Sequence, residues 1–134
     1  MSVKSKQAMS DAERAEKQNR AVCRAIFVTR QDLGLKTVDL AKILDVNVRT
    51  INRWENEELI PGLDEKRHLR EAASHLIAIF RSLAAMFSSA QDREAWIKTA
   101  HPELVDAPLE IMKGSMEGLI QVRRYLDYVR GRGA

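Results

Sequence analysis

The segment formed by residues 64–87 constrains the fold most strongly, because its apolar side chains recur at helical spacing. Pro61 and Gly62 precede it, and the polar stretch 88–92 follows it. A helix that starts at Asp64 and covers this segment would be roughly 36 Å long at about 1.5 Å per residue. That length exceeds one wall of a compact N-terminal bundle, so we expect this helix to join two modules. Its predicted apolar face contains Leu69, Ala72, Ala73, Leu76, Ile77, Phe80, Leu83, Ala84 and Phe87.

The chain before this segment also has helical periodicity. Ser10 and Glu13 have the spacing of a capping box, which predicts a long helix that starts there and ends at Gly34. Two short helices are expected next, one over residues 37–44 and one that Asn47 caps. The apolar stripe of the first, long helix contains Ala15, Val22, Ile26 and Leu33.

Three further helices are expected after residue 92, over residues 93–99, 108–113 and 116–130. Asp106 is a candidate cap for the second, and Gly114 and Gly131 are expected to close the last two. The last helix has an apolar stripe of Leu119, Val122, Leu126 and Val129, with Arg123, Arg124 and Asp127 facing outward.

No strand pattern competes with these helices, so the predicted fold class is all-α. Residues 1–9 are expected to form a flexible tail. Residues 10–63 should form an N-terminal helical bundle, and the long helix should join it to a small C-terminal helical domain within residues 64–134.

Charge permits a polyanionic partner without demanding one. The chain has 22 basic and 19 acidic side chains and a net charge of +3. Residues 1–35 have a net charge of +3, and residues 36–61 have a net charge of −1. The single Cys23 excludes an internal disulfide and a multi-cysteine zinc site. No signal peptide or membrane-spanning run is visible, so we expect a cytoplasmic protein without membrane contact.

Residues 35–61, LKTVDLAKILDVNVRTINRWENEELIP, are the first motif that suggests a function. Their spacing resembles the Xre/Cro-repressor helix-turn-helix family, with Asp45 where the turn usually has glycine. The resemblance implies that the second helix reads the major groove of operator DNA. Arginines there could bind guanine in a bidentate manner, or they could simply solvate an exposed helix. The implied DNA-binding residues are Thr37, Val48, Arg49, Thr50 and Arg53.

The same resemblance implies an ion pair between Arg30 and Glu55. Glu57 replaces the usual glycine of the family, and Glu58 follows it. These acids lie beyond the reading turn, and they should weaken non-specific phosphate attraction more than base reading. Basic side chains between Lys4 and Arg20 could offset them. The apolar residues of the motif, Leu40, Leu44, Val46, Ile51 and Trp54, are expected to form a small core.

A second motif covers residues 95–131, AWIKTAHPELVDAPLEIMKGSMEGLIQVRRYLDYVRG. It resembles the toxin-binding domain of the Xre/MbcA/ParS antitoxin family, with His101 replacing the usual Asn. The family's positions are occupied by Trp96, Pro102, Leu104, Pro108, Met112, Gly118, Val122, Leu126 and Gly131.

This resemblance implies that the partner is a RES-domain toxin, an enzyme that uses or degrades NAD, whose cleft is covered by the antitoxin's C-terminal end. A short, glycine-rich, cationic tail suits a cleft that is built for a pyrophosphate. A frayed terminus is the alternative for the last two residues. The implied toxin-binding residues are Trp96, Pro102, Leu104, Pro108, Tyr128, Arg130, Gly131 and Arg132.

Other chemistry has weaker support in the sequence. Asp64, His68, Glu71 and His75 share a helix face and could gather a metal, but solvated neighbour pairs are the more frequent outcome. Cys23 with His101 lacks a third orienting group, so neither an enzyme nor a cofactor is expected.

The sequence thus favours an antitoxin that sequesters a RES-type toxin and represses its own operon as a homodimer. A stand-alone Xre-family transcriptional regulator is the alternative. A pure inhibitor whose helix-turn-helix no longer binds DNA would differ from the first hypothesis only in operator binding.

Overall fold

The computed structural model describes residues 9–133, so most of the predicted tail over residues 1–9 lies outside the described residues. The described part is all-α, as predicted, and contains no strand. Its elements are α2 (Asp11–Asp32), α3 (Thr37–Leu44), α4 (Val48–Glu57), η1 (Leu63–Glu65), α5 (Arg67–Met86), α6 (Ala90–Lys98), α7 (Pro108–Gly114) and α8 (Met116–Gly133).

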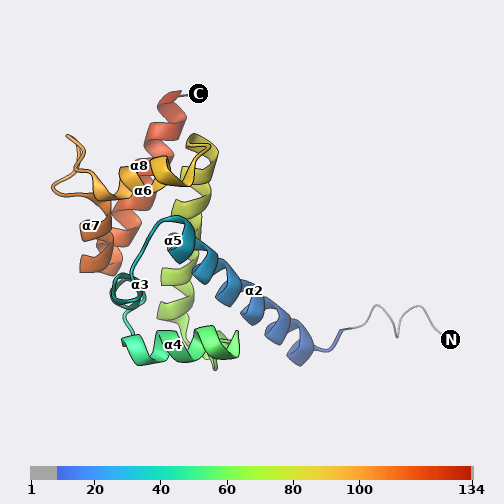
Figure 1. The fold of residues 1–134 in the computed structure, drawn as a ribbon. Helices are drawn as coiled ribbons and strands as arrows, with labels where there is room; N and C mark the ends of the chain where they lie inside the picture. The colour runs from blue at the N-terminus through green and yellow to red at the C-terminus, as the bar shows by residue number, and fades with distance from the viewer. Residues whose placement is uncertain (1–8, 134) are drawn as a thin grey trace.

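Helix α5 runs through the centre of the molecule, between α2 on one side and α8 on the other (Figure 1). The buried side chains form one hydrophobic cluster that extends from Ile26 of α2 through α5 to Leu126 of α8. The predicted boundary at residue 63 is therefore not marked by a gap in the core. The face that α5 buries consists of Leu69, Ala72, Ala73, Leu76, Ile79, Ser82 and Leu83.

Two details of the predicted long helix are wrong. Asp64 does not start it, because Gly62 adopts a left-handed φ of 69° and residues 63–65 form a separate 3-10 turn. Helix α5 therefore has 20 residues, or about 30 Å at 1.5 Å per residue. The buried face includes Ile79, which the prediction left out. It does not include Ala84, which the prediction placed there but which is exposed.

Helix α2 has the predicted start and end. The Ser10 side chain accepts a hydrogen bond from the Glu13 amide at 3.1 Å, and Gly34 has a φ of 63° just beyond the helix. Asn19 fixes α2 to the segment after α4. Its side chain donates to the Ile60 carbonyl at 2.6 Å and accepts from the Ile60 amide at 2.8 Å.

A three-residue turn joins α3 to α4. Asp45, where the resemblance to helix-turn-helix proteins predicts glycine, has a left-handed φ of 57°. Asn47 caps α4 as predicted, since its side chain accepts from the Thr50 amide at 2.8 Å. Helix α4 ends at Glu57, and Glu58 takes the left-handed conformation with a φ of 55°. Asp45 and Glu58 thus occupy a backbone conformation that glycine adopts at lower free energy. Leu40, Leu44, Ile51 and Trp54 are buried as predicted, and Val46 is half-buried.

The C-terminal helices differ from the prediction at their ends. Helix α6 starts earlier, at Ala90, because Ser89 accepts a hydrogen bond from the Asp92 amide at 3.1 Å. Helix α7 is capped by Ala107 rather than Asp106, whose carboxylate accepts from the Ala107 amide instead. Helix α8 does not end before Gly131. It continues to Gly133, so the expected glycine-rich tail is the last turn of a helix.

Gly118 allows α8 to lie directly against the backbone of α7. A Cβ atom at this position would come within 2.2 Å of the Ile111 carbonyl oxygen. Only glycine permits so close an approach. The contact fixes how α8 leaves α7, and therefore where the end of α8 points.

Candidate functional site

Two surfaces carry the residues that the sequence singled out, and they lie at opposite ends of the molecule. Helix α4 forms one end, and the C-terminal end of α8 projects from the other, beside the end of α5 (Figure 1). The loop 99–107 also belongs to the half of the molecule that lies away from α4. Each surface is therefore accessible when the other is covered.

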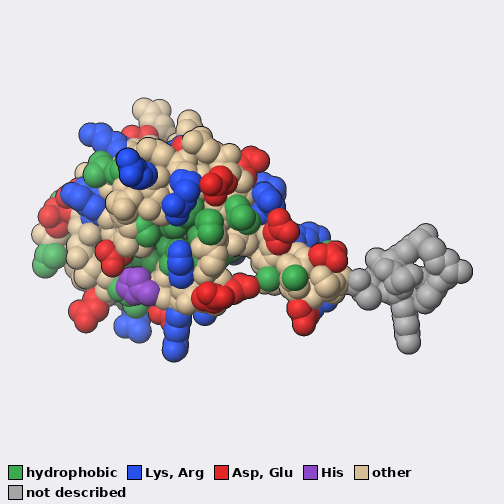
Figure 2. All heavy atoms as spheres, turned by 90° about the horizontal axis from the view of Figure 1, so that it is seen from below, with side chains coloured by type: hydrophobic (Ala, Val, Ile, Leu, Met, Phe, Trp, Pro, Cys, Tyr) green, Lys and Arg blue, Asp and Glu red, His purple; other side chains and the backbone are tan. Residues whose placement is uncertain are grey.

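The α4 surface presents the predicted arginines to solvent. Arg49 and Arg53 are exposed, Val48 is 39% exposed, and Thr50 is half-buried beside its cap Asn47. Figure 2, which views the molecule from below, shows basic side chains interspersed with acidic ones rather than gathered in one basic field. Attraction to phosphates in general should therefore be modest, and any DNA recognition should depend on individual side chains.

Arg30 and Glu55 form the ion pair that the sequence suggested. Two nitrogen atoms of the guanidinium donate to the two carboxylate oxygens, Nη1 to Oε1 at 3.2 Å and Nη2 to Oε2. Arg30 also donates to the Thr37 hydroxyl at 3.3 Å and lies 5.0 Å above the Phe27 ring. The ion pair joins α2 to α4. The hydrogen bond from Arg30 also makes the Thr37 hydroxyl less available to a phosphate.

At the other surface, Trp96 of α6 organises the loop that follows it. The Trp96 ring lies 4.6 Å from the His101 ring and 6.2 Å from the Tyr125 ring of α8, measured between centroids. A His101 ring nitrogen is 2.9 Å from the Trp96 carbonyl oxygen. The Tyr125 hydroxyl donates to Glu103 at 3.3 Å. These contacts hold the loop 99–107 against α8.

The predicted toxin-binding residues have different environments in this region. Pro108 is buried at the first turn of α7, Leu104 is half-buried, and Pro102 is exposed. Tyr128 is 53% exposed on α8. Pro108 therefore supports the loop rather than offering a contact surface.

Val105 is a residue that the sequence reasoning missed. It is 92% exposed at the tip of the loop. The sequence signal that could have identified it is a valine in the polar loop between Glu103 and Asp106. An exposed aliphatic side chain on a fixed loop suits a protein contact.

The end of α8 is fixed to α5. Arg130 donates a hydrogen bond to the buried hydroxyl of Ser82 at 3.1 Å. Helix α8 continues past this contact through Gly131. The Arg130 side chain is therefore held in a defined direction, which reduces the entropy that it would lose on binding.

An ion pair ties this half of the molecule to α2. Arg93 of α6 donates two hydrogen bonds to the Asp32 carboxylate, at 2.8 Å and 2.7 Å, and a third to the Phe87 carbonyl at 2.7 Å. The pairing with Asp32 raises the pKa of Arg93. Nearby, Lys98 donates to the Gly34 carbonyl at 3.1 Å. The start of α6 is thus fixed on the end of α2.

Arg93→Ala is expected to destabilise the fold, because it leaves the half-buried Asp32 carboxylate without its bidentate partner. The midpoint of urea unfolding should fall clearly. The matched control is Arg67→Ala, whose ion pair with Glu71 is exposed and should contribute little. Equal midpoints for the two variants would show that the Asp32 pair does not stabilise the fold.

A second tie connects α7 to α3. Lys113 donates to Asp39 at 3.3 Å and to Glu110 at 2.9 Å, and the hydrogen bond to Glu110 is the main cause of its raised pKa. Asp39 also accepts a hydrogen bond from the Lys36 amide at 2.9 Å at the start of α3. The Asp39 carboxylate therefore both caps α3 and joins it to α7.

His75 on α5 accepts a hydrogen bond from Arg123 of α8, over 2.9 Å between Nη1 and Nδ1. Arg123 is therefore not turned outward as predicted. A guanidinium only donates, so Nδ1 must be unprotonated. Burial lowers the pKa of His75 below 6.5, and the charge of Arg123 lowers it further.

This lowered pKa makes the fold less stable in mild acid. Below pH 6.5 the unfolded chain binds a proton at His75 that the folded chain binds only at lower pH, so the free energy of unfolding falls as pH decreases through this window. His75→Gln is expected to flatten the dependence between pH 7 and about pH 5, measured by urea unfolding. His68→Gln, at an exposed position, is the control. An unchanged slope in His75→Gln would contradict the assignment.

The other chemistry considered from the sequence finds no geometric support. Burial raises the pKa of the Cys23 thiol to about 11, and its sulfur faces the Trp54 carbonyl, away from the cluster that contains His101. Among residues 9–133, no three His, Cys, Asp or Glu side chains are grouped to hold a metal ion. No described helix is both long and apolar enough to cross a membrane.

Part of the chain matches a known family. Residues 82–132 match the family described as antitoxin Xre/MbcA/ParS C-terminal toxin-binding domain. No curated protein matches the sequence. The matched region contains the end of α5, all of α6 and α7, the Trp96 cluster and most of α8. It covers less than half of the chain and supports an antitoxin role in a toxin–antitoxin system. The second surface therefore lies in a segment that is similar to the toxin-binding domain of Xre/MbcA/ParS antitoxins.

Proposed function

We propose that this protein is the antitoxin of a type II toxin–antitoxin system and neutralises a RES-type, NAD-consuming toxin. The observation that carries the proposal is the match of residues 82–132 to a toxin-binding antitoxin domain. The RES identity of the toxin rests on the resemblance of residues 95–131 to antitoxins of such toxins. The protein itself acts by binding, since the matched family is one of binding domains.

The toxin is held by the loop 99–107 and the C-terminal part of α8. Val105 and Tyr128 offer exposed apolar area on fixed elements, which suits an interface anchor. Arg130 keeps Nη1 on Ser82 and offers its other N–H groups to the cleft where the toxin binds the NAD pyrophosphate, and Arg132 adds a second positive charge to this end of the chain. Arginine pairs with phosphate oxygens through short, charge-assisted hydrogen bonds. Inhibition follows because this end of α8 occupies the cleft.

Helix α4 gives the protein a second activity, binding to operator DNA of its own operon as a homodimer. Arg49 and Arg53 read bases, Val48 and Thr50 line the same turn, and Arg30 with Glu55 holds α4 on α2. Because the α4 surface and the end of α8 lie at opposite ends of the molecule (Figure 1), the antitoxin can bind toxin and DNA together.

Co-expression with the product of the neighbouring open reading frame tests the proposal. That product should arrest growth when expressed alone and deplete cellular NAD. Co-expression of this protein should restore growth, and the two should purify as a complex that binds the shared promoter. Absence of a complex would reject the antitoxin role and leave a stand-alone Xre-family regulator. A complex without promoter binding would leave a pure inhibitor.

A further inference from the structure

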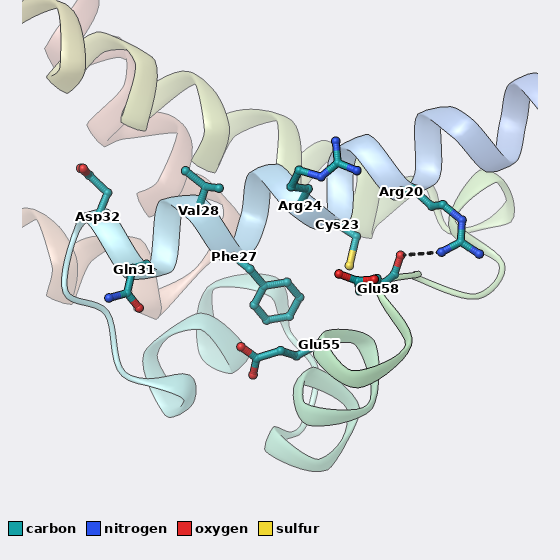
Figure 3. Close-up of a pocket in the computed structure, with 9 residues that line it drawn as sticks. All are labelled: Arg20, Cys23, Arg24, Phe27, Val28, Gln31, Asp32, Glu55 and Glu58. Atoms are coloured by element: carbon teal, nitrogen blue, oxygen red, sulfur yellow. Dashed lines mark hydrogen bonds between the residues drawn. The ribbon is translucent and has the colours of Figure 1, made fainter.

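A groove along α2, separate from both surfaces, has no assigned role. It measures about 590 Å³ and lies between one face of α2 and the wall of α4 (Figure 3). Phe27 and Val28 form its apolar centre, with the buried Cys23 at its floor. Val28 is 49% exposed, although it lies in the middle of a helix that packs against the core. The lining extends along α2 from Arg20 to Asp32, about 18 Å at 1.5 Å per residue.

Among the described residues, the charged side chains around the groove are paired except for one cation and one anion. Asp32 pairs with Arg93, Glu55 with Arg30, and Arg20 with Glu16. Arg24 of α2 and the side chain of Glu58 have no hydrogen-bond or ion-pair partner within residues 9–133. Figure 3 shows Arg24 on α2 and Glu58 just beyond α4, both beside the apolar centre and toward the Arg20 end of the groove.

We propose that this groove is the dimer interface and that its occupant is the same groove of a second copy of the chain. In a two-fold symmetric interface each patch contacts its own copy, so it must be complementary to itself. One apolar centre with one unpaired cation and one unpaired anion beside it meets this condition. Val28 lies against its counterpart near the two-fold axis, and Arg24 of each chain pairs with Glu58 of the other. This inference rests on the proposed homodimer and identifies its contact surface.

The DNA-reading side chains remain free in this dimer. At helical spacing, Arg49 and Arg53 lie on the side of α4 opposite Glu55, and Glu58 lies just beyond the end of α4. Because Glu55 and Glu58 line the groove, Arg49 and Arg53 face away from the partner chain. Two copies joined through α2 therefore present two α4 helices, as reading of a palindromic site requires.

Val28→Glu tests the apolar centre. The full chain should be dimeric by sedimentation equilibrium, and Val28→Glu should be monomeric, because two carboxylates would meet at the axis. Val105→Glu introduces the same change at an exposed loop position and should remain dimeric. A monomeric wild type, or a Val28→Glu variant as dimeric as the control, would overturn the proposal. Circular dichroism checks that both variants are folded.

A charge exchange tests the pairing without touching the apolar centre. Arg24→Glu alone and Glu58→Arg alone should each raise the dimer dissociation constant roughly tenfold or more, because like charges then face each other. An equimolar mixture of the two variants should recover the dimer. In the mixed dimer, the carboxylate introduced at position 24 meets the guanidinium introduced at position 58, and the native Arg24–Glu58 pair forms in the second contact. A mixture as weak as its components would overturn the pairing.

These measurements need neither toxin nor DNA. Their failure would therefore leave the antitoxin proposal standing, and failure of the co-expression test would leave the dimer interface standing.

Discussion

Reversing two charges at the end of α8 is expected to abolish inhibition of the toxin. Arg130→Glu with Arg132→Glu places two carboxylates where the proposed cleft binds a pyrophosphate. Each charge-assisted hydrogen bond contributes about 1.5–3 kcal/mol, so loss of two should weaken inhibition by roughly a hundredfold or more. The measurement is the concentration of antitoxin that halves NAD consumption by the purified toxin.

The matched control reverses two exposed arginines far from this end, Arg14 and Arg67, and so changes the net charge equally. It should inhibit as the wild type does. If the double variant at 130 and 132 also inhibits normally, the C-terminal segment does not cover the cleft. Retained binding without inhibition would instead separate the contacts of the loop 99–107 from those of the α8 end.

Replacing both arginines of α4 is expected to remove operator recognition. Arg49→Ala with Arg53→Ala deletes two contacts, each with a discrimination of about 1–3 kcal/mol when bidentate to guanine. Binding to the promoter should weaken roughly thirtyfold or more. Electrophoretic mobility shift at constant salt measures this, because phosphate contacts depend strongly on salt.

Arg14→Ala with Lys17→Ala removes the same charge from exposed positions on α2, away from the proposed toxin and DNA surfaces, and controls for net charge. Toxin neutralisation should be unchanged in both double variants. Equal promoter binding by the wild type and the α4 variant would reject Arg49 and Arg53 as reading residues.

Much of the local structure could be predicted, because caps and periodicity are local signals. Ser10 and Asn47 start α2 and α4 as expected, and Gly34 follows α2 with a positive φ. The Arg30–Glu55 contact was accessible through the family resemblance, since it pairs two motif positions. The all-α class followed from the periodicity of the long central helix.

Other features depend on tertiary contacts that no local pattern encodes. Asp32 and Arg93 are separated by 61 positions, and Asp39 and Lys113 by 74. Gly131 looked like a helix end, yet glycine alone does not terminate a helix, and α8 continues past it. The polar stretch 88–92 predicts a break between helices, although a serine before an acidic turn can also be an N-cap, as Ser89 is.

The continuous core along α5 limits how such proteins can exchange parts. Side chains of α8 such as Leu119 and Leu126 belong to the same cluster as Leu76 of α5, and α5 also packs on α2. A chimera that joins residues 1–81 of this chain to the toxin-binding segment of another antitoxin would therefore combine two halves of one core. Recombination between such genes should succeed only where the incoming α8 fits the resident α5, so the α4 surface and the α8 surface are inherited together.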